Sequence, residues 1–187
     1  MNKLYLSIPL LLGLAGSATL VLGDDDEREY GQGGWFSQSR LDVAPVDNPS
    51  YREECGGCHL PYQPGLLPAR SWEKMMASLD DHFGENAELD SETNTSIRNY
   101  LVANAADQSS YKRSQGINRS LSDDETPLRI TETRYFQRKH HEIPLRYVKD
   151  NPEVGSFSRC QACHTNAEKG SYNEHEVRIP GAVGWED

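Results

Sequence analysis

Two pentapeptides decide the fold of this 187-residue chain, Cys55-Gly56-Gly57-Cys58-His59 and Cys160-Gln161-Ala162-Cys163-His164. Each places two cysteines three positions apart with a histidine directly after them, and together they contain all four cysteines. This pattern is typical of covalent c-type haem attachment, in which both sulfurs bond to the porphyrin and the histidine binds the iron. We therefore predict two covalently bound haem c groups, attached through Cys55, Cys58, Cys160 and Cys163 and bound at iron by His59 and His164.

Zinc binding, disulfides and a thioredoxin-like redox pair are the competing interpretations of these cysteines. Paired zinc motifs usually lie about 15 to 20 residues apart, whereas Cys55 and Cys160 are 105 positions apart. Histidine is 6 of the 187 residues, so chance would put it after both pairs about once in a thousand. A redox pair needs a strand before it and a long helix after it, but Pro61 and Pro64 follow the first pair. Haem attachment is the favoured interpretation.

The first 23 residues have the layout of a secretory signal peptide. Lys3 is the only charged side chain before Asp24, and the stretch between them is almost wholly apolar. A retained membrane anchor is the alternative, but proline and glycine inside the stretch and a small residue at its end favour cleavage. We expect export across the bacterial inner membrane to the periplasm, as covalent haem attachment of this kind requires.

The charge and the polarity of the chain restrict its partners. Loss of residues 1–23, which include Lys3, would change the net charge from −10 to −11. Such a chain is a poor candidate for binding nucleic acid or an anionic membrane surface, and it would attract a basic protein partner. Hydrophobic residues make up only 36%, so we expect the haems to supply core and neither half to be stable without them.

The chain is expected to be mainly α, with two haem-binding parts of different character. A class I cytochrome c-like N-terminal haem domain would be followed by a small, largely irregular C-terminal haem domain. Proline-rich sequence with no sustained helical pattern supports the second half of this expectation. The predicted parts are a signal peptide (1–23), a flexible acidic and glycine-rich arm (24–45), the first haem domain (46–107), a linker (108–126) and the second haem domain (127–187).

Three helices are expected in residues 46–107. The first begins at Pro49 after the cap Asn48 and runs into the first haem motif. The second would be capped by Ser71, run to about Phe83 and be closed by Gly84. The third would begin at residue 90 or 91, with Ile97, Leu101 and Asn104 on one stripe of its surface.

This order of elements resembles a class I cytochrome c over residues 46–107. Such domains usually bind the far side of the iron with a methionine between the last two helices, but no methionine follows Met76. Met75 and Met76 are expected to be ordinary core residues of the second helix. We therefore predict that His82, on the apolar side of that helix, is the sixth ligand of the first haem.

Three further segments resemble the periplasmic dihaem cytochrome c family, the dihaem partner of the sphaeroides haem protein. They are His82 to Ala87, Arg138 to Pro144 and Pro152 to Phe157, and the resemblance spans almost all of the exported chain. It implies two bis-histidine haems, with His82 serving the first and His140 the second. His141 and His175 stay open as alternatives, and a crossed assignment of the distal histidines would leave the same sequence. The resemblance also implies two redox partners, an oxygen-binding sphaeroides haem protein-like acceptor and a membrane cytochrome b-type donor.

The function follows from this coordination. Iron held by two protein imidazoles has no vacant position for a substrate, and the lack of a methionine ligand favours low potentials. We expect a single-electron relay between a membrane donor and a soluble haem protein, with no catalytic residues and no enzymatic activity. The alternative is a dihaem peroxidase or reductase with one open or displaceable axial position, and gas binding would require the same open position.

Overall fold

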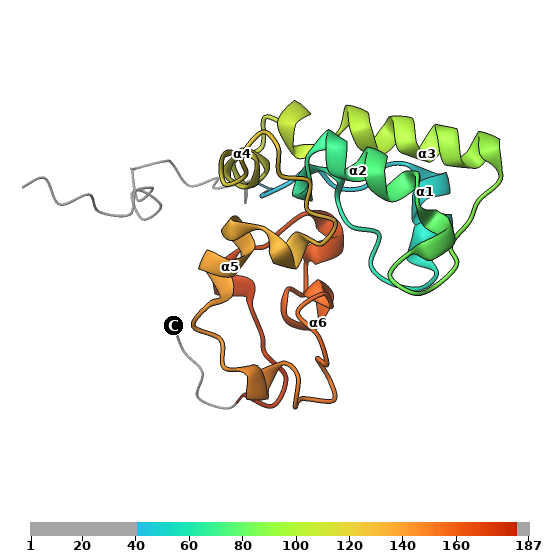
Figure 1. Cartoon of the computed structure of the whole chain (residues 1–187). Helices are drawn as coiled ribbons and strands as arrows, with labels where there is room; N and C mark the ends of the chain where they lie inside the picture. The colour runs from blue at the N-terminus through green and yellow to red at the C-terminus, as the bar shows by residue number, and fades with distance from the viewer. Residues whose placement is uncertain (1–40, 183–187) are drawn as a thin grey trace, which may run out of the picture. The chain divides into compact units, whose positions relative to one another are not determined.

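The computed structural model describes residues 41–182, and in this part of the chain it is mainly helical, with no β-strand (Figure 1). The signal peptide predicted for residues 1–23 and most of the predicted arm lie outside the described residues. The α-helices are α1 (Pro49–Gly56), α2 (Ala69–Met76), α3 (Ser91–Ala103), α4 (Lys112–Arg119), α5 (Arg134–His140) and α6 (Cys160–Cys163). Short 3₁₀ turns are formed by Pro64–Leu66, Leu79–Asp81, Ala106–Gln108, Ile130–Glu132, Leu145–Tyr147, Ala167–Lys169 and Glu174–Glu176.

Helix α1 forms as expected and delivers the first haem motif. The Asn48 side chain accepts a hydrogen bond from the Tyr51 amide at 2.8 Å, and Pro49 occupies the first helical position. Both features satisfy or remove backbone donors that a helix start leaves without partners. The helix then runs through Cys55 to Gly56, so the first attachment cysteine lies on its last turn.

Helix α2 is shorter than predicted at both ends. It begins at Ala69, whose amide donates to the Asp107 carboxylate at 2.8 Å, and Ser71 lies inside the helix with its side chain buried. It ends at Met76 rather than Phe83. The predicted Ser71 cap was wrong because the capping group comes from 38 residues further along the chain. His82 therefore does not lie on the helix.

Helix α3 agrees with the predicted third helix. The Asp90 carboxylate accepts hydrogen bonds from the amides of Glu92 and Thr93, both at 3.0 Å, and caps the helix. Ile97 and Leu101 are buried, as expected, whereas Asn104 is the exposed C-terminal cap and does not share their stripe. Helices α2 and α3 pack against each other (Figure 1) around a hydrophobic cluster of Val46, Tyr51, Leu67, Trp72, Met76, Leu79, Ile97, Leu101 and Ala105.

The segment 108–126 is not an irregular connection, because it contains α4. Ser114 and Ile117 on this helix are buried, and Ile117 joins a second hydrophobic cluster with Val43, Leu60, Leu66, Ala167 and Tyr172. Residues 41–45 also differ from the expected flexible arm. The amides of Asp42 and Val43 both donate to the Gly170 carbonyl, and Val43 is fully buried. This cluster therefore draws on both ends of the described chain.

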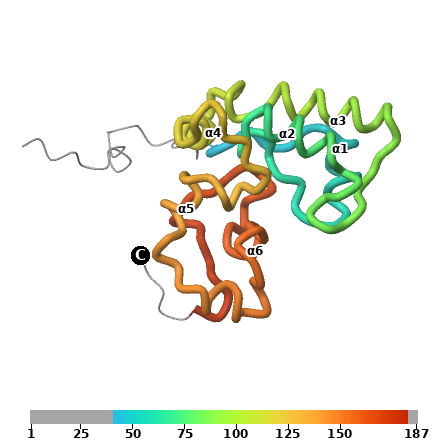
Figure 2. Tube along the Cα trace, in the orientation of Figure 1, coloured from blue at the N-terminus to red at the C-terminus, as the bar shows by residue number. Residues whose placement is uncertain are grey.

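Residues 127–182 contain little regular structure, as the sequence indicated. Helices α5 and α6 are short, and the chain between and after them follows an irregular path (Figure 2). The division into domains at 46–107 and 127–187 stays a prediction, since all described residues belong to one compact unit. None of the helices in residues 41–182 has the length and apolar character that a membrane span requires.

Candidate haem sites

The first candidate site combines the motif after α1 with His82. Cys55 is half-buried against the first hydrophobic cluster, whereas Cys58 and His59 are exposed. His82 follows the 3₁₀ turn that succeeds α2, and its ring centre lies 6.2 Å from that of His59, with 21° between the ring planes. The structure thus brings together the two histidines predicted for the first haem.

A tight turn presents His82. The His82 amide donates to the Glu85 carbonyl at 2.7 Å, and the following residue, Phe83, adopts a φ of +58°. This left-handed conformation is costly for a bulky side chain. The Arg129 guanidinium lies 3.8 Å from the centre of the Phe83 ring. Phe83 is 45% exposed instead of packing inward as the longer helix would require. His82 is therefore held by a strained turn rather than by a helix.

The second candidate site combines α6 with the end of α5. Cys160 and Cys163 begin and end α6, and His164 follows directly. His140 is the last residue of α5, and its ring centre lies 6.1 Å from that of His164, with 74° between the planes. Phe136 stacks on His140 at 3.9 Å between ring centres and 10° between planes. This stacking limits the orientation of the His140 ring.

Both histidine pairs have the spacing of two imidazoles on one metal ion. Bonds of about 2 Å from a central metal to two opposed imidazole nitrogens put the ring centres about 6 Å apart. The observed 6.2 and 6.1 Å fit this arrangement. The Nδ1 atoms of His59 and His140 lie 2.7 and 2.9 Å from the carbonyl oxygens of Leu60 and Phe136. Such contacts leave Nε2 of these rings available to a metal.

The two alternative histidines are differently placed. His141 and His175 are both exposed. His141 Nδ1 lies 2.8 Å from the Arg138 carbonyl oxygen, and its Nε2 lies 3.7 Å from the Glu142 carboxylate. The ligand set itself stays a prediction, and the contacts favour His82 and His140 over these two residues.

The protonation of the histidines suits metal binding. Burial, followed by the nearby His140 and Arg113, lowers the pKa of His164 to about 4. Burial is also the main cause of the lowered pKa of His82 and of His140. A neutral imidazole is the form that binds a metal. At neutral pH these three side chains are therefore ready to donate a nitrogen lone pair.

The cysteines fit thioether formation better than zinc binding. Burial raises the pKa of Cys55 and of Cys160 to about 11, so a neutral sulfur is favoured at both positions. None of the four cysteines forms a disulfide. Zinc would need a gathered set of thiolates, but within residues 41–182 no three His, Cys, Asp or Glu side chains are grouped to hold a metal ion together.

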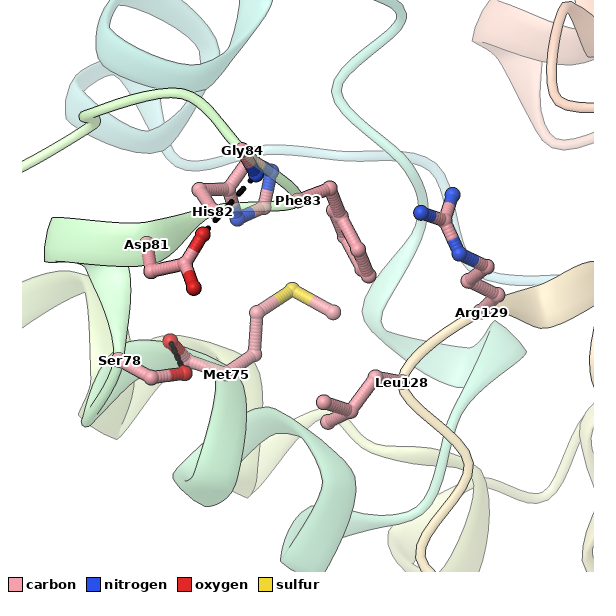
Figure 3. A pocket seen from close by; sticks show the side chains of 8 residues that line it. All are labelled: Met75, Ser78, Asp81, His82, Phe83, Gly84, Leu128 and Arg129. Atoms are coloured by element: carbon pink, nitrogen blue, oxygen red, sulfur yellow. Dashed lines mark hydrogen bonds between the residues drawn. The ribbon is translucent and has the colours of Figure 1, made fainter.

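A pocket of about 400 Å³ opens beside His82 (Figure 3). The Met75 side chain lines this pocket, whereas Met76 is buried in the first cluster as expected for a core residue. At its wall, the Asp81 carboxylate accepts a hydrogen bond from the Gly84 amide at 3.0 Å and closes the turn that carries His82. The lining is completed by Ser78, Asp81, Phe83, Gly84, Leu128 and Arg129.

Sequence reasoning missed several residues that support the second site. Arg113 donates to the Asp42 carboxylate at 3.0 Å and lies 5.9 Å from the ring centre of Tyr172. The Tyr172 ring in turn lies 5.2 Å from that of His164. Arg113 belongs to the segment expected to be a linker, so no local pattern marked it. Tyr62, whose pKa burial raises to about 12, was likewise not singled out.

Comparison with known proteins identifies the family of this chain. The dihaem cytochrome c family matches residues 51–172. A diheme cytochrome c from Rhodobacter sphaeroides is 45% identical, with a TM-score of 0.62, and the match covers 70% of this chain and 100% of that one. A diheme cytochrome type c from Shewanella baltica OS155 is also 45% identical, with a TM-score of 0.59 and coverage of 72% and 94%. No curated protein matches. With both attachment motifs inside the matched residues, the chain belongs to the dihaem cytochrome c family, and so carries two covalently attached haem c groups and serves in electron transfer.

Proposed function

We propose that the protein relays single electrons through two low-potential bis-histidine haems, between a membrane cytochrome b-type donor and a soluble haem protein acceptor. The observation that carries this proposal is the spacing of the two histidine pairs, 6.2 Å for His59 and His82 and 6.1 Å for His140 and His164. Both pairs fit a metal bound from opposite sides. Families of c-type cytochromes are typically extracytoplasmic, and the relay is proposed to operate in the periplasm.

In each site, some contacts would attach the haem and others would adjust its reduction potential. The cysteine pairs would hold the porphyrin as thioethers, and the histidine pairs would hold the iron. An iron so held would supply one-electron exchange with the same protein ligands in both oxidation states, which would favour fast transfer over substrate chemistry. The carbonyl contacts of His59 and His140 would raise the donor strength of these rings. This effect and the lack of methionine ligation both favour low potentials.

The distribution of charge supports two different docking surfaces. Residues 41–107 contain 12 acidic and 4 basic side chains, a net charge of −8, whereas residues 108–182 contain 10 acidic and 12 basic ones, a net charge of +2. Arg138 and Arg146, which flank His140 in sequence, are exposed, and Leu145 beside them is 55% exposed. The first region therefore suits a basic partner and the second an acidic one, through weak and salt-sensitive contacts.

The test is the visible spectrum of the exported protein, reduced with dithionite, before and after addition of carbon monoxide. Bis-histidine haems should give sharp low-spin bands that carbon monoxide leaves unchanged. A carbon monoxide shift in about half of the haem would mean that one axial position is open. That result would contradict the relay with two closed haems and favour a peroxidase, reductase or gas-binding protein.

A further inference from the structure

One side chain, Tyr62, contacts both haem segments. Its ring lies against that of His59, with 5.0 Å between centres and 26° between planes. Its hydroxyl donates a hydrogen bond of 2.6 Å to the Ser158 carbonyl oxygen, 96 residues further along the chain. The tyrosine is also packed, half-buried, against both hydrophobic clusters. It is thus in direct contact with the motif histidine of the first site and with the backbone just before the second motif.

The contact continues to a haem-attachment sulfur. Cys160 Sγ lies 3.7 Å from the same Ser158 carbonyl oxygen that accepts the Tyr62 hydroxyl. A continuous series of contacts therefore runs from the His59 ring through Tyr62 and Ser158 to Cys160. If the proposed relay is correct, its two ends are an iron ligand of the first haem and a thioether sulfur of the second.

We infer that Tyr62 is the positioning residue that couples the two haems electronically, through its stacked ring and its hydroxyl hydrogen bond. Electron transfer between fixed centres weakens with the gap that the electron must cross, and bonds and hydrogen bonds couple better than empty space. In each transfer one ferrous iron is oxidised and the other, ferric, iron is reduced. Tyr62 itself gains and loses nothing, and its hydroxyl proton stays in place.

The neighbouring residue, Gln63, also joins the two haem segments, but it is not part of the series of contacts through Tyr62. Gln63 is fully buried; its amide nitrogen donates to the Ala167 carbonyl and its amide oxygen accepts from the Tyr172 hydroxyl, both at 2.6 Å. Each partner of Gln63 belongs to the second haem segment. Removal of the Tyr62 hydroxyl therefore leaves the two segments joined, so the electronic role of Tyr62 is separable from a purely structural one.

The experiment measures electron exchange between the two haems in the full haem-loaded protein. Partially reduced samples of wild type, Tyr62→Phe and Tyr62→Leu are compared by proton NMR, with the exchange rate taken from the haem methyl signals. The expected order is wild type fastest, Tyr62→Phe several-fold slower and Tyr62→Leu slowest. The visible spectra and both reduction potentials should stay close to those of wild type.

Tyr51→Phe is the matched control. The Tyr51 hydroxyl also donates to a backbone carbonyl, that of Tyr62 at 2.8 Å, so it makes no direct hydrogen bond to the second haem segment. Its removal should leave the exchange rate unchanged. Equal exchange rates in wild type, Tyr62→Phe and Tyr62→Leu would overturn the inference, as would equal slowing by Tyr51→Phe. Either result, in a protein whose haems ignore carbon monoxide, would leave the proposed relay intact.

Discussion

At the scale of single residues, the site histidines differ in the hydrogen-bond partner of Nδ1, the ring nitrogen that would not bind the metal. Nδ1 of His59 and of His140 each meet a backbone carbonyl. His164 Nδ1 is buried and has no hydrogen-bond partner among the described residues. A hydrogen bond at this atom fixes the ring and raises its basicity. The fixing of the His164 ring therefore depends more on the packing of Tyr172 against it.

Removal of a distal histidine should open one haem and leave the other closed. His82→Ala and His140→Ala are each expected to make about half of the haem high-spin and reactive with carbon monoxide, because one iron loses its sixth ligand. The measurement is the visible spectrum of the reduced protein with and without carbon monoxide. His141→Ala is the control, since this exposed neighbour should leave both irons closed. An unchanged low-spin spectrum in either distal variant would refute that ligand assignment.

At the scale of elements, local sequence predicted the helices whose caps are local. Asn48 and Asp90 directly precede α1 and α3 and cap them, so both starts were readable. Helix α2 is capped by Asp107, and the residue before it, Pro68, has no side-chain hydrogen bond to offer. The spacing of its apolar residues also suggested a continuous helix to Phe83, because that pattern does not reveal the turn that carries His82. A contact distant in sequence caps the start of α2, whereas a locally hydrogen-bonded turn around His82 replaces its predicted end.

The long-range cap of α2 should contribute measurably to stability. Asp107→Ala is expected to lower the free energy of unfolding by about 1 kcal/mol, the usual cost of losing a helix cap. Asp107→Asn should lose less, because its amide oxygen also accepts a hydrogen bond from the Ala69 amide. Guanidinium unfolding of the haem-loaded protein, followed by circular dichroism, measures both. A stability of Asp107→Ala equal to that of wild type would show that this contact contributes nothing.

At the scale of the whole molecule, the net charge of −10 conceals an uneven distribution of charge along the chain. Residues 41–107 carry a net charge of −8, whereas residues 108–182 carry a net charge of +2, so a basic partner stays a prediction for the first region alone. The cofactors and the family were predictable, because each attachment motif is local and complete. Tyr62, Gln63 and Arg113 were not, since each makes a hydrogen bond to a residue at least 59 positions away in the chain.

The charge division predicts different responses to charged electron donors. Photoreduced flavin mononucleotide is anionic, whereas lumiflavin is neutral. In the wild-type protein, Arg138 and Arg146 should raise the rate of reduction by flavin mononucleotide relative to the rate of reduction by lumiflavin. The combined substitution Arg138→Gln and Arg146→Gln should slow the anionic flavin alone, and added salt should remove the difference. Arg98→Gln, at an exposed site on α3, is the matched control. Equal slowing of both flavins would show that the basic side chains near His140 do not steer the donor.

The angles between the histidine planes, 21° in the first pair and 74° in the second, should make the two ferric haems magnetically different. Nearly parallel imidazoles interact with the same one of two iron d orbitals and so separate the energies of the two. Nearly perpendicular ones act on both orbitals alike and leave them almost degenerate. Electron paramagnetic resonance of the frozen oxidised protein should therefore show one rhombic and one strongly anisotropic signal, and His140→Ala should remove only the second. Two haems with the same ligands would thus be told apart by the rotation of a ring.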